Sequence, residues 1–429
     1  MNSCLLSERE AKKNVNYLAG LDFIISLGFG LIMPLFPQYV NLLGGGGLEV
    51  GILFSSFVLT RAILATPFGN LSDRIGRKRL ILIGSFLYAL LAVLFTVPND
   101  WLGLTFVRAL QGVASAMVWP VSEALVIDSC PASKRGSSLG KIVMSSNLGM
   151  VVGPFIGGAL YFVAANYLGF SINDSFKFPF YFTALIALVG AFLVWANVTD
   201  AKSPVSGKHK ITFKKLLRPD GMDKQGLRNL KVLYANAAME GFSFSSIGPL
   251  MALFLLLEFE LEADAISILI GTAMGLGALV AYPSGRLSDR AGRKKLFVVG
   301  GFFAFLGTML IPFGWTLWLV VLFLAMRSMA FQVSSPALRA LQADTVPEEV
   351  RGRLIGMLES MSNFGSVLGA PIGGVLLDAF FAKDLGLPSP FTGTMIPFLV
   401  AGGLGMFTVF MVQALVKEKP QPRIDGPPS

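Results

Sequence analysis

Long apolar stretches alternate with short polar segments along almost the whole chain. A membrane-spanning helix needs about 20 mostly apolar residues, and twelve stretches meet this requirement. The first six lie at roughly 15–40, 48–69, 78–97, 101–127, 137–164 and 178–198. The second six lie at roughly 230–257, 264–284, 294–312, 315–341, 352–381 and 391–416. The pattern therefore predicts an all-α polytopic membrane protein with twelve transmembrane helices.

The longest polar interruption divides the chain into two halves. Residues 199–229 are rich in Lys, Pro and Gly and contain the single histidine, His209. We interpret them as a linker with a short amphipathic helix around Ile211–Leu217. The predicted domains are a six-helix bundle at 1–198, the linker at 199–229, a second six-helix bundle at 230–416 and a tail at 417–429.

Composition agrees with a protein that has the bilayer as its solvent. Of the 429 residues, 54% are hydrophobic and 14% are charged, whereas soluble domains carry about 25% charged residues. The chain therefore has too few polar residues to cover the surface of a soluble protein of this length.

Lysine and arginine residues gather on one side of the predicted topology. They occupy loops 2–3, 4–5, 8–9 and 10–11, the linker and both termini, whereas the opposite side has only Lys177 and Lys383. By the positive-inside rule, we expect both termini and the linker to be cytoplasmic, in the plasma or inner membrane. The net charge of +9 is then a topology signal and a contact with anionic lipid, and we expect no nucleic-acid partner.

The two predicted halves are copies of one unit. The stretch Gly69–Lys78 recurs almost letter for letter at Gly285–Lys294, 216 positions later. At the same offset, Asp128 matches Asp344 and Pro120 matches Pro336. Glycines of helix 5 also match those of helix 11: Gly149, Gly153, Gly157 and Gly158 correspond to Gly365, Gly369, Gly373 and Gly374. A parallel repeat of this kind is a known plan for secondary transporters, with the site between the halves near the midplane.

These motifs resemble those of the major facilitator superfamily over nearly the whole chain. The pattern G-x-L-S-D-R-x-G-R-K resembles the family's loop 2–3 signature and is complete in both halves. Arg108-Ala-Leu-Gln-Gly112 resembles the second motif, in helix 4. Helix 5 resembles the motif of the drug:proton antiporter branch through Gly149, Gly153, Pro154, Gly157 and Gly158. In helix 11, Ala370 stands where this proline would fall. The resemblance implies alternating access, and it favours proton-coupled export of a hydrophobic or amphipathic small molecule.

The resemblance also implies a cytoplasmic latch that starts at Gly69. Asp73 would face the cytoplasmic start of helix 11, and Arg77 would pair with Asp128, so that both contacts hold the cytoplasmic side closed. A carboxylate near a helix N-terminus gains about 0.3–1 kcal/mol when exposed and up to about 2 kcal/mol when partly buried. The repeat extends the same roles to Gly285, Asp289, Arg293 and Asp344.

Ionisable side chains inside the predicted spans are the strongest site candidates, because a charge in the membrane is costly and by default functional. Asp22 and Glu240 occupy nearly equivalent repeat positions. No histidine lies in a span, so proton coupling requires carboxylates, and an apolar cavity favours their neutral form. The candidates for proton coupling are Asp22, Arg108, Glu123, Glu240 and Glu359.

The same side chains also allow structural interpretations. Asp22 and Glu240 could be close enough to the interface to be hydrated, and Glu123 could pair with an arginine of a neighbouring helix. We expect Arg61 and Arg327 to form salt bridges between helices. Asp378, near the outer end of helix 11, is expected to be hydrated.

Other function classes lack support in the sequence. Gly44–Gly47 is interpreted as an outer turn rather than a phosphate loop, because no Lys-Ser/Thr follows it. Without a metal cluster or a catalytic Cys/His pair, we expect no enzyme activity and no cofactor beyond a proton gradient. Cys4 and Cys130 are both predicted to be cytoplasmic, so no disulfide is expected. Charged residues lead directly into the first apolar helix, so we expect no cleavable signal peptide.

We expect a monomer whose partners are a small-molecule substrate, protons and membrane lipid. The alternatives are a facilitator or symporter for a sugar or metabolite, a lipid-type flippase, and a membrane sensor that transports nothing.

Overall fold

The computed structural model describes residues 6–201, 224–345, 351–381 and 393–417, and these residues form helices with no strand among them. The first half contains α1 (Glu8–Ile32), α2 (Leu35–Leu42), α3 (Gly47–Ile75), α4 (Arg77–Leu94), α5 (Trp101–Ser129), α6 (Ala132–Asn166) and α7 (Ile172–Asn197). The second half contains α9 (Lys224–Ile247), α10 (Met251–Phe259), α11 (Ala263–Ala291), α12 (Arg293–Leu310), η1 (Ile311–Phe313), α13 (Leu317–Thr345), α14 (Arg351–Phe380), η3 (Gly393–Met395) and α15 (Ile396–Leu415). The predicted linker helix at 211–217 lies outside the described residues.

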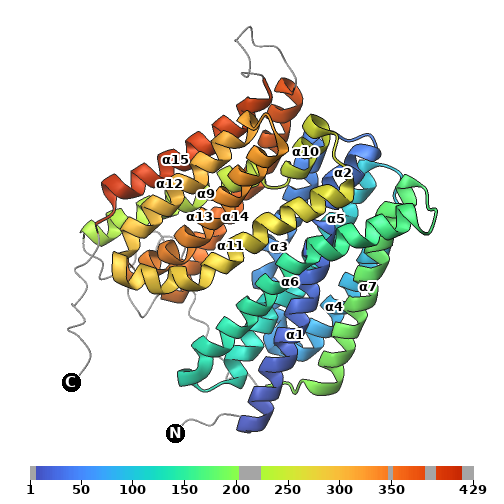
Figure 1. Ribbon diagram of the computed structural model, residues 1–429. Coiled ribbons are helices and arrows are strands. Elements are labelled where there is room, and N and C mark those ends of the chain that lie inside the picture. The colour runs from blue at the N-terminus through green and yellow to red at the C-terminus, as the bar shows by residue number, and fades with distance from the viewer. Residues whose placement is uncertain (1–5, 202–223, 346–350, 382–392, 418–429) are drawn as a thin grey trace.

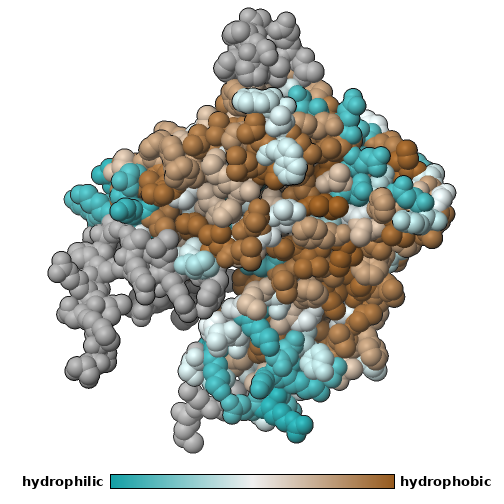
Figure 2. Space-filling model, viewed as in Figure 1, coloured by the Kyte–Doolittle hydropathy of each residue, from teal (hydrophilic) through white to brown (hydrophobic). Residues whose placement is uncertain are grey.

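The prediction of twelve membrane-spanning helices is confirmed. By length and composition, the described residues contain 11 helices that could cross a membrane. The remaining span is α4, which has 18 residues and begins with Arg77-Lys78-Arg79, so its basic end lowers its apolar character. Figure 2 shows an apolar belt across the middle of the molecule, with hydrophilic surface at the two ends. The chain is therefore a multi-pass membrane protein.

The first and seventh spans are interrupted, although the sequence pattern predicts each as one continuous helix. Between α1 and α2 the chain breaks at Met33-Pro34, and between α9 and α10 it breaks at Gly248-Pro249-Leu250. Proline lacks the N–H that the helix ladder needs and clashes with the carbonyl four residues earlier. The two breaks occupy corresponding places in the two halves.

The polar loop predicted between the second and third spans is almost entirely helical. Helix α3 continues to Ile75, six residues beyond the predicted end of the span, and α4 begins at Arg77. The single residue between them is Gly76, whose φ is 100°. Gly292, with a φ of 91°, joins α11 to α12 in the same way. Glycine adopts this left-handed conformation without the steric cost that other residues meet.

Glycines bring the backbones of two helix pairs into direct contact. In α6, a Cβ atom at Gly149 would lie 2.8 Å from the backbone nitrogen of Leu27, and one at Gly153 would lie 2.6 Å from that of Leu31. Gly157 also faces Leu31 of α1, and α6 continues through Pro154 without a break. In the second half, three glycines of α14 face the backbone of α9 in the same manner: Gly365, Gly369 and Gly373.

The fourth glycine of each stripe faces the other half of the molecule. Gly158 of α6 lies against Asp264 and Ser267 of α11, and Gly374 of α14 lies against Gly47 of α3. Figure 1 shows the two halves, blue to green and yellow to red, side by side and diverging toward one end. We call this the basic end, which carries Gly76 and Gly292, and we call the opposite end, which carries Gly44–Gly47, the distal end. The halves are therefore closed together at the distal end and separated at the basic end.

Replacing Gly153 by Val should destabilise the fold, because the new side chain would meet the backbone of α1. Overpacking of this kind costs about 1–3 kcal/mol, so we expect a lower melting temperature and a lower yield of folded protein. Gly140→Val is the matched control, since no atom lies within 4 Å of a Cβ atom at this position of the same helix. Thermal unfolding of the purified variants measures the difference, and equal shifts would contradict the packing role.

Candidate functional site

Four charged side chains are exposed to solvent although they lie well inside the helices that carry them. They are Arg61 of α3, Glu123 of α5, Arg339 of α13 and Glu359 of α14, which we call the central charge cluster. By the rise of an α-helix, Arg61 lies about 21 Å from the end of α3 at Ile75. The surface in Figure 2 is hollowed between the halves toward the basic end. Solvent thus reaches the cluster from the basic end.

The central charge cluster contains one acid and one base from each half. The electrostatic neighbours of Glu123 are Glu359, Arg61 and Arg339, and those of Arg61 include Glu359 and Glu123. Among the described residues, none of the four forms an ion pair within 4 Å. Across the hollow, the acid of each half therefore has a base of the other half as an electrostatic neighbour.

Asp22 and Glu240 lie deeper in their halves than the central charge cluster. Asp22 of α1 is only 2% exposed, and its Oδ1 has no hydrogen-bond partner among the described residues. A hydrated, interfacial position for Asp22 therefore does not fit the structure. Glu240 of α9 is half-buried and accepts a hydrogen bond of 3.2 Å from Nδ2 of Asn236. The charged groups that act on them are Glu123 for Asp22 and Arg339 for Glu240.

Arg108 is completely enclosed, and aromatic rings surround its guanidinium group. The group lies 4.6–5.3 Å from the ring centres of four phenylalanines, Phe29, Phe36, Phe54 and Phe57. One Nη donates a hydrogen bond to Oε1 of Gln111. A desolvated cation over an aromatic face gains about 2 kcal/mol or more, so the rings offset part of the cost of burying this charge.

Buried polar atoms continue from Arg108 along one face of α5. Gln111, Ser115 and Ser122 each keep a polar atom without a hydrogen-bond partner among the described residues, as does Tyr88 of the neighbouring α4. Spacings of three, four and seven residues place these side chains on one face of the helix. Ordered water usually satisfies such groups, so this seam of α5 is suited to hold water inside the first half.

The expected salt bridges of Arg61 and Arg327 are not formed, and aromatic contacts take their place in the described part of the chain. Arg61 lies 4.7 Å from the ring centre of Trp119, and Arg327 lies 5.3 Å from that of Phe244. Nε of Arg327 also donates a hydrogen bond of 3.1 Å to the hydroxyl of Thr308. Weakly hydrated guanidinium groups stack readily on aromatic faces, which explains why no acid is needed at either position.

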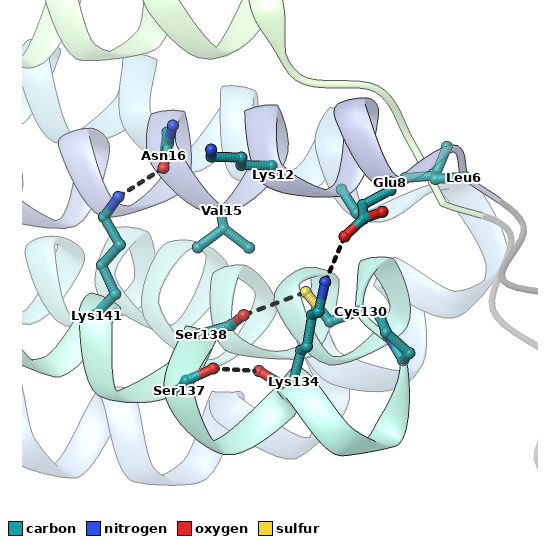
Figure 3. A pocket seen from close by; sticks show the side chains of 12 residues that line it. Leu6, Glu8, Lys12, Val15, Asn16, Cys130, Lys134, Ser137, Ser138 and Lys141 are labelled. Atoms are coloured by element: carbon teal, nitrogen blue, oxygen red, sulfur yellow. Dashed lines mark hydrogen bonds and ion pairs between the residues drawn. The ribbon is translucent and has the colours of Figure 1, made fainter.

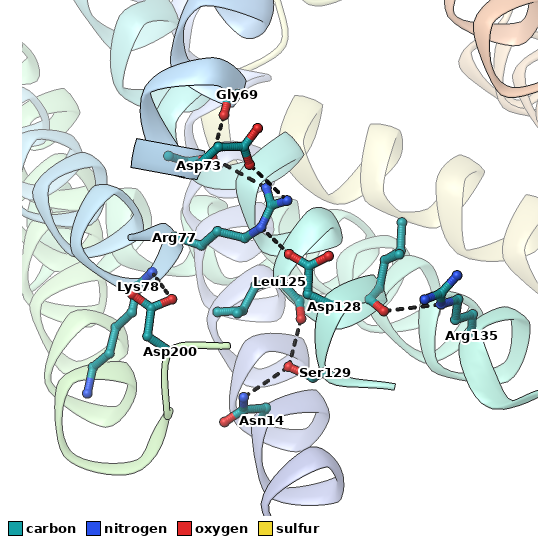
Figure 4. A network of polar contacts seen from close by, with 12 residues as sticks. Asn14, Gly69, Asp73, Arg77, Lys78, Leu125, Asp128, Ser129, Arg135 and Asp200 are labelled. Atoms are coloured by element: carbon teal, nitrogen blue, oxygen red, sulfur yellow. Dashed lines mark hydrogen bonds and ion pairs between the residues drawn. The ribbon is translucent and has the colours of Figure 1, made fainter. Parts of the chain in front are cut away.

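The residues of the predicted latch meet at the basic end of the first half (Figure 4). Arg77 forms an ion pair with Asp128 and lies 3.1 Å from Asp73, which is half-exposed. The hydroxyl of Ser72 donates a hydrogen bond of 2.6 Å to the carbonyl oxygen of Gly69. These ion pairs all lie within the first half. The prediction that the Arg77–Asp128 contact holds the cytoplasmic side closed is therefore wrong, because the pair is formed while the halves are separated at this end.

The second half repeats part of this arrangement. Arg293 forms an ion pair with Asp344 and donates a hydrogen bond of 3.3 Å to the carbonyl oxygen of Ala340. Gly285 and Asp289 lie in α11, but the side chain of Asp289 and the surroundings of Gly285 lie outside the described part. The start of helix 11, which Asp73 is predicted to face, is the first turn of α14, where the side chains of residues 351–353 likewise lie outside the described part.

Asp378 makes a contact between the halves that the sequence did not predict. Its side chain is exposed as expected, but Oδ1 accepts a hydrogen bond of 2.7 Å from the backbone N–H of Gly47, and Oδ2 accepts one of 2.8 Å from Leu48. The carboxylate of α14 thus caps the N-terminus of α3, where unpaired N–H groups carry partial positive charge. Nearby, the hydroxyl of Ser55 donates a hydrogen bond of 2.7 Å to the carbonyl oxygen of Val367. Asp378 therefore fastens the two halves together at the distal end.

A family model described as Major Facilitator Superfamily matches residues 18–232 and 233–428 of the chain. An uncharacterized MFS-type transporter of Methanocaldococcus jannaschii is 27% identical over 86% of this chain and 92% of its own length. Multidrug resistance protein 2 of Bacillus subtilis is 26% identical over 90% of this chain and 92% of its own. Quinolone resistance protein NorA of Staphylococcus aureus is 25% identical over 83% and 88%, respectively.

Solved structures share the fold at low sequence identity. A bacterial homolog of the human lysosomal transporter Spinster, in an inward-facing and unoccupied conformation, has a TM-score of 0.74 at 16% identity and covers 96% of both chains. The nucleoside transporter NupG has a TM-score of 0.69 at 15% identity, and the match covers 95% of this chain and 100% of its own. Both results describe the fold alone.

Replacing Asp378 by Ala should shift the protein away from the conformation that is closed at the distal end. Loss of an N-terminal cap costs about 0.5–2 kcal/mol, so we expect the closed population to fall relative to the open one by about 2- to 30-fold. Spin labels at Leu42 of α2 and Leu257 of α10, both exposed, would report the change as longer distances in double electron–electron resonance.

The matched control is Asp174→Ala, because among the described residues Asp174 bonds to Ser171 and Lys177 of its own half. Its distance distribution should equal that of the unsubstituted protein. An unchanged distribution in Asp378→Ala would show that the cap does not hold the distal end closed.

Proposed function

The chain belongs to the major facilitator superfamily, and from this premise we propose that it exports hydrophobic or amphipathic small molecules in exchange for protons. The superfamily consists of transporters, which makes the chain a transport protein rather than an enzyme. Two of its relatives over most of the chain are named for multidrug and quinolone resistance. Their names support export of small molecules that partition into membranes.

One observation carries the proton part of the proposal: Asp22 and Glu240 are carboxyl groups withdrawn into the two halves at nearly equivalent places. A charged carboxylate away from water is costly, so each position favours a neutral, proton-carrying group in one conformation. Among the described residues, neither side chain has a cation within ion-pair distance. Exposure of either group to water on the opposite side of the membrane would release its proton.

The transport step is a rocking of the two halves about the hollow between them. With the basic end in the cytoplasm, as the positive-inside rule requires, the conformation described above is open to the cytoplasm and closed by Asp378 on the outside. Closure of the basic end would bring Arg61 toward Glu359 and Glu123 toward Arg339, which are unlike charges from opposite halves. In this proposal the central charge cluster closes the inner side, and Asp22 and Glu240 carry the protons.

Proteoliposomes loaded with a lipophilic cation, a neutral amphipath or a lipophilic weak acid test this function. An imposed pH gradient should drive at least one of these probes against its own gradient. Asp22→Asn and Glu240→Gln should each lower the proton-driven rate by about tenfold or more, whereas Glu258→Gln, on an exposed side chain at the distal end, should leave it unchanged.

Two results would contradict the proposal. Transport that is the same with and without a pH gradient would indicate a facilitator. Movement of fluorescent lipid, but of none of the three probes, would indicate a flippase.

Asp73→Asn should leave expression intact but strongly impair transport, because the neutral amide loses the attraction to a helix N-terminus. The attraction is worth up to about 2 kcal/mol, which corresponds to a loss of up to about 30-fold in the population closed at the basic end. Arg79→Gln, an exposed basic residue next to this stretch, serves as the control and should transport within about twofold of the unsubstituted protein. Equal rates for both variants would remove the gating role of Asp73.

A further inference from the structure

A pocket of about 630 Å³ opens at the basic end, between the first turns of α1 and α6. Figure 3 shows Lys12 of α1 and Lys134 and Lys141 of α6 around it, with Cys130 of the α5–α6 connection between the two helices. The pocket lies apart from the hollow that holds the central charge cluster. Neither the latch nor the proton-coupling candidates line it.

Positive charge predominates in this pocket. Lys134 forms an ion pair with Glu8, the only acidic residue of the lining. Nζ of Lys141 donates a hydrogen bond of 2.6 Å to Oδ1 of Asn16, which leaves its charge uncompensated. Lys12 has no ion pair in the described part of the chain. Among the described residues, two of the three ammonium groups therefore form no ion pair, and Lys12 acts on Glu8 only at longer range.

The start of α6 adds hydrogen-bond donors and a favourable dipole. The residue before α6, Pro131, lines the pocket and offers no side-chain cap, so no side chain of its own caps the positive end of this helix. The hydroxyl of Ser138 lines the pocket and is 3.4 Å from Sγ of Cys130, whereas that of Ser137 already donates to the carbonyl oxygen of Lys134. Ammonium groups, one hydroxyl and a helix N-terminus together match the chemistry of a phosphate group.

The surroundings distinguish a lipid phosphate from a soluble one. Apolar side chains of α1, Ala11 and Val15, form part of the lining. Beyond Lys141, α6 exposes Met144 (71%) and Leu148 (53%). These residues follow Lys141 at three and seven positions and so continue on its face of the helix. A polar head and apolar tails would meet matching surfaces along one path.

We propose that this pocket binds the headgroup phosphate of an anionic phospholipid from the leaflet at the basic end. Basic pockets between transmembrane helices on the cytoplasmic side are suited to such headgroups. The site is independent of the transported substrate, so it would exist whatever the protein carries.

Lipid binding to the delipidated, detergent-purified protein tests the site. Phosphatidylglycerol should bind at least tenfold more tightly than phosphatidylcholine in a native mass spectrometry titration, and it should raise the melting temperature more. The double variant Lys12→Gln/Lys141→Gln should reduce this preference to about twofold or less. Lys12→Arg/Lys141→Arg should retain it, which separates lost charge from lost folding.

The matched control is Lys231→Gln/Lys295→Gln, which removes the same charge from exposed side chains at the same end of the second half. This control should keep the full preference. Equal losses in the two double Gln variants would show general attraction to a basic surface and would overturn the proposed site. Glycerol phosphate that binds as tightly as phosphatidylglycerol would assign the pocket to a soluble phosphate and would also overturn it.

Discussion

Direct contact between helix backbones is the interaction on which the arrangement of this protein depends. Helices in lipid gain little from burying apolar side chains against one another, so close packing through small residues must supply the attraction. The stripe that contains Gly149 and Gly153 fastens α6 to α1, and the repeated stripe fastens α14 to α9. Each stripe ends in a glycine that faces the other half, Gly158 or Gly374. The same helices thus build each half and hold the two halves together.

The closed distal end is not symmetric, although the two halves are repeats. Asp378 caps α3, but the residue at its repeat position, 216 places earlier, is Phe162. The N-terminus of α11, which corresponds to that of α3, begins after Glu262 without a side-chain cap. The contact between α3 and α14 is therefore stabilised by packing together with a charge-assisted cap. The contact between α6 and α11 is stabilised by packing without this cap. Separation of α6 from α11 therefore costs less free energy than separation of α3 from α14.

Apolar length and glycine spacing were sufficient to predict the twelve spans and the two-fold repeat, because both follow from local sequence. The helix breaks were not predictable in this way, since Pro34 interrupts its helix while Pro154 remains inside one. Asp378 was interpreted as a hydrated residue. Its partners lie 331 and 330 positions away, so the local sequence does not reveal them. Arg327 was expected beside an acid, yet it lies on Phe244. These outcomes depend on which faces of distant helices meet, and hydropathy alone does not contain that information.

The enclosure of Arg108 has an electrical consequence. A guanidinium group keeps its proton even when buried, so the first half carries a fixed positive charge within the membrane-spanning part of α5, and Arg327 places another in α13. One elementary charge moved across the whole membrane changes the free energy by about 2.3 kcal/mol per 100 mV. A rocking motion that carried such a group about 3 Å through a hydrocarbon layer of about 30 Å would cover about a tenth of that field. Each arginine would then contribute about 0.2 kcal/mol per 100 mV, so membrane voltage would act on the balance between the two conformations directly.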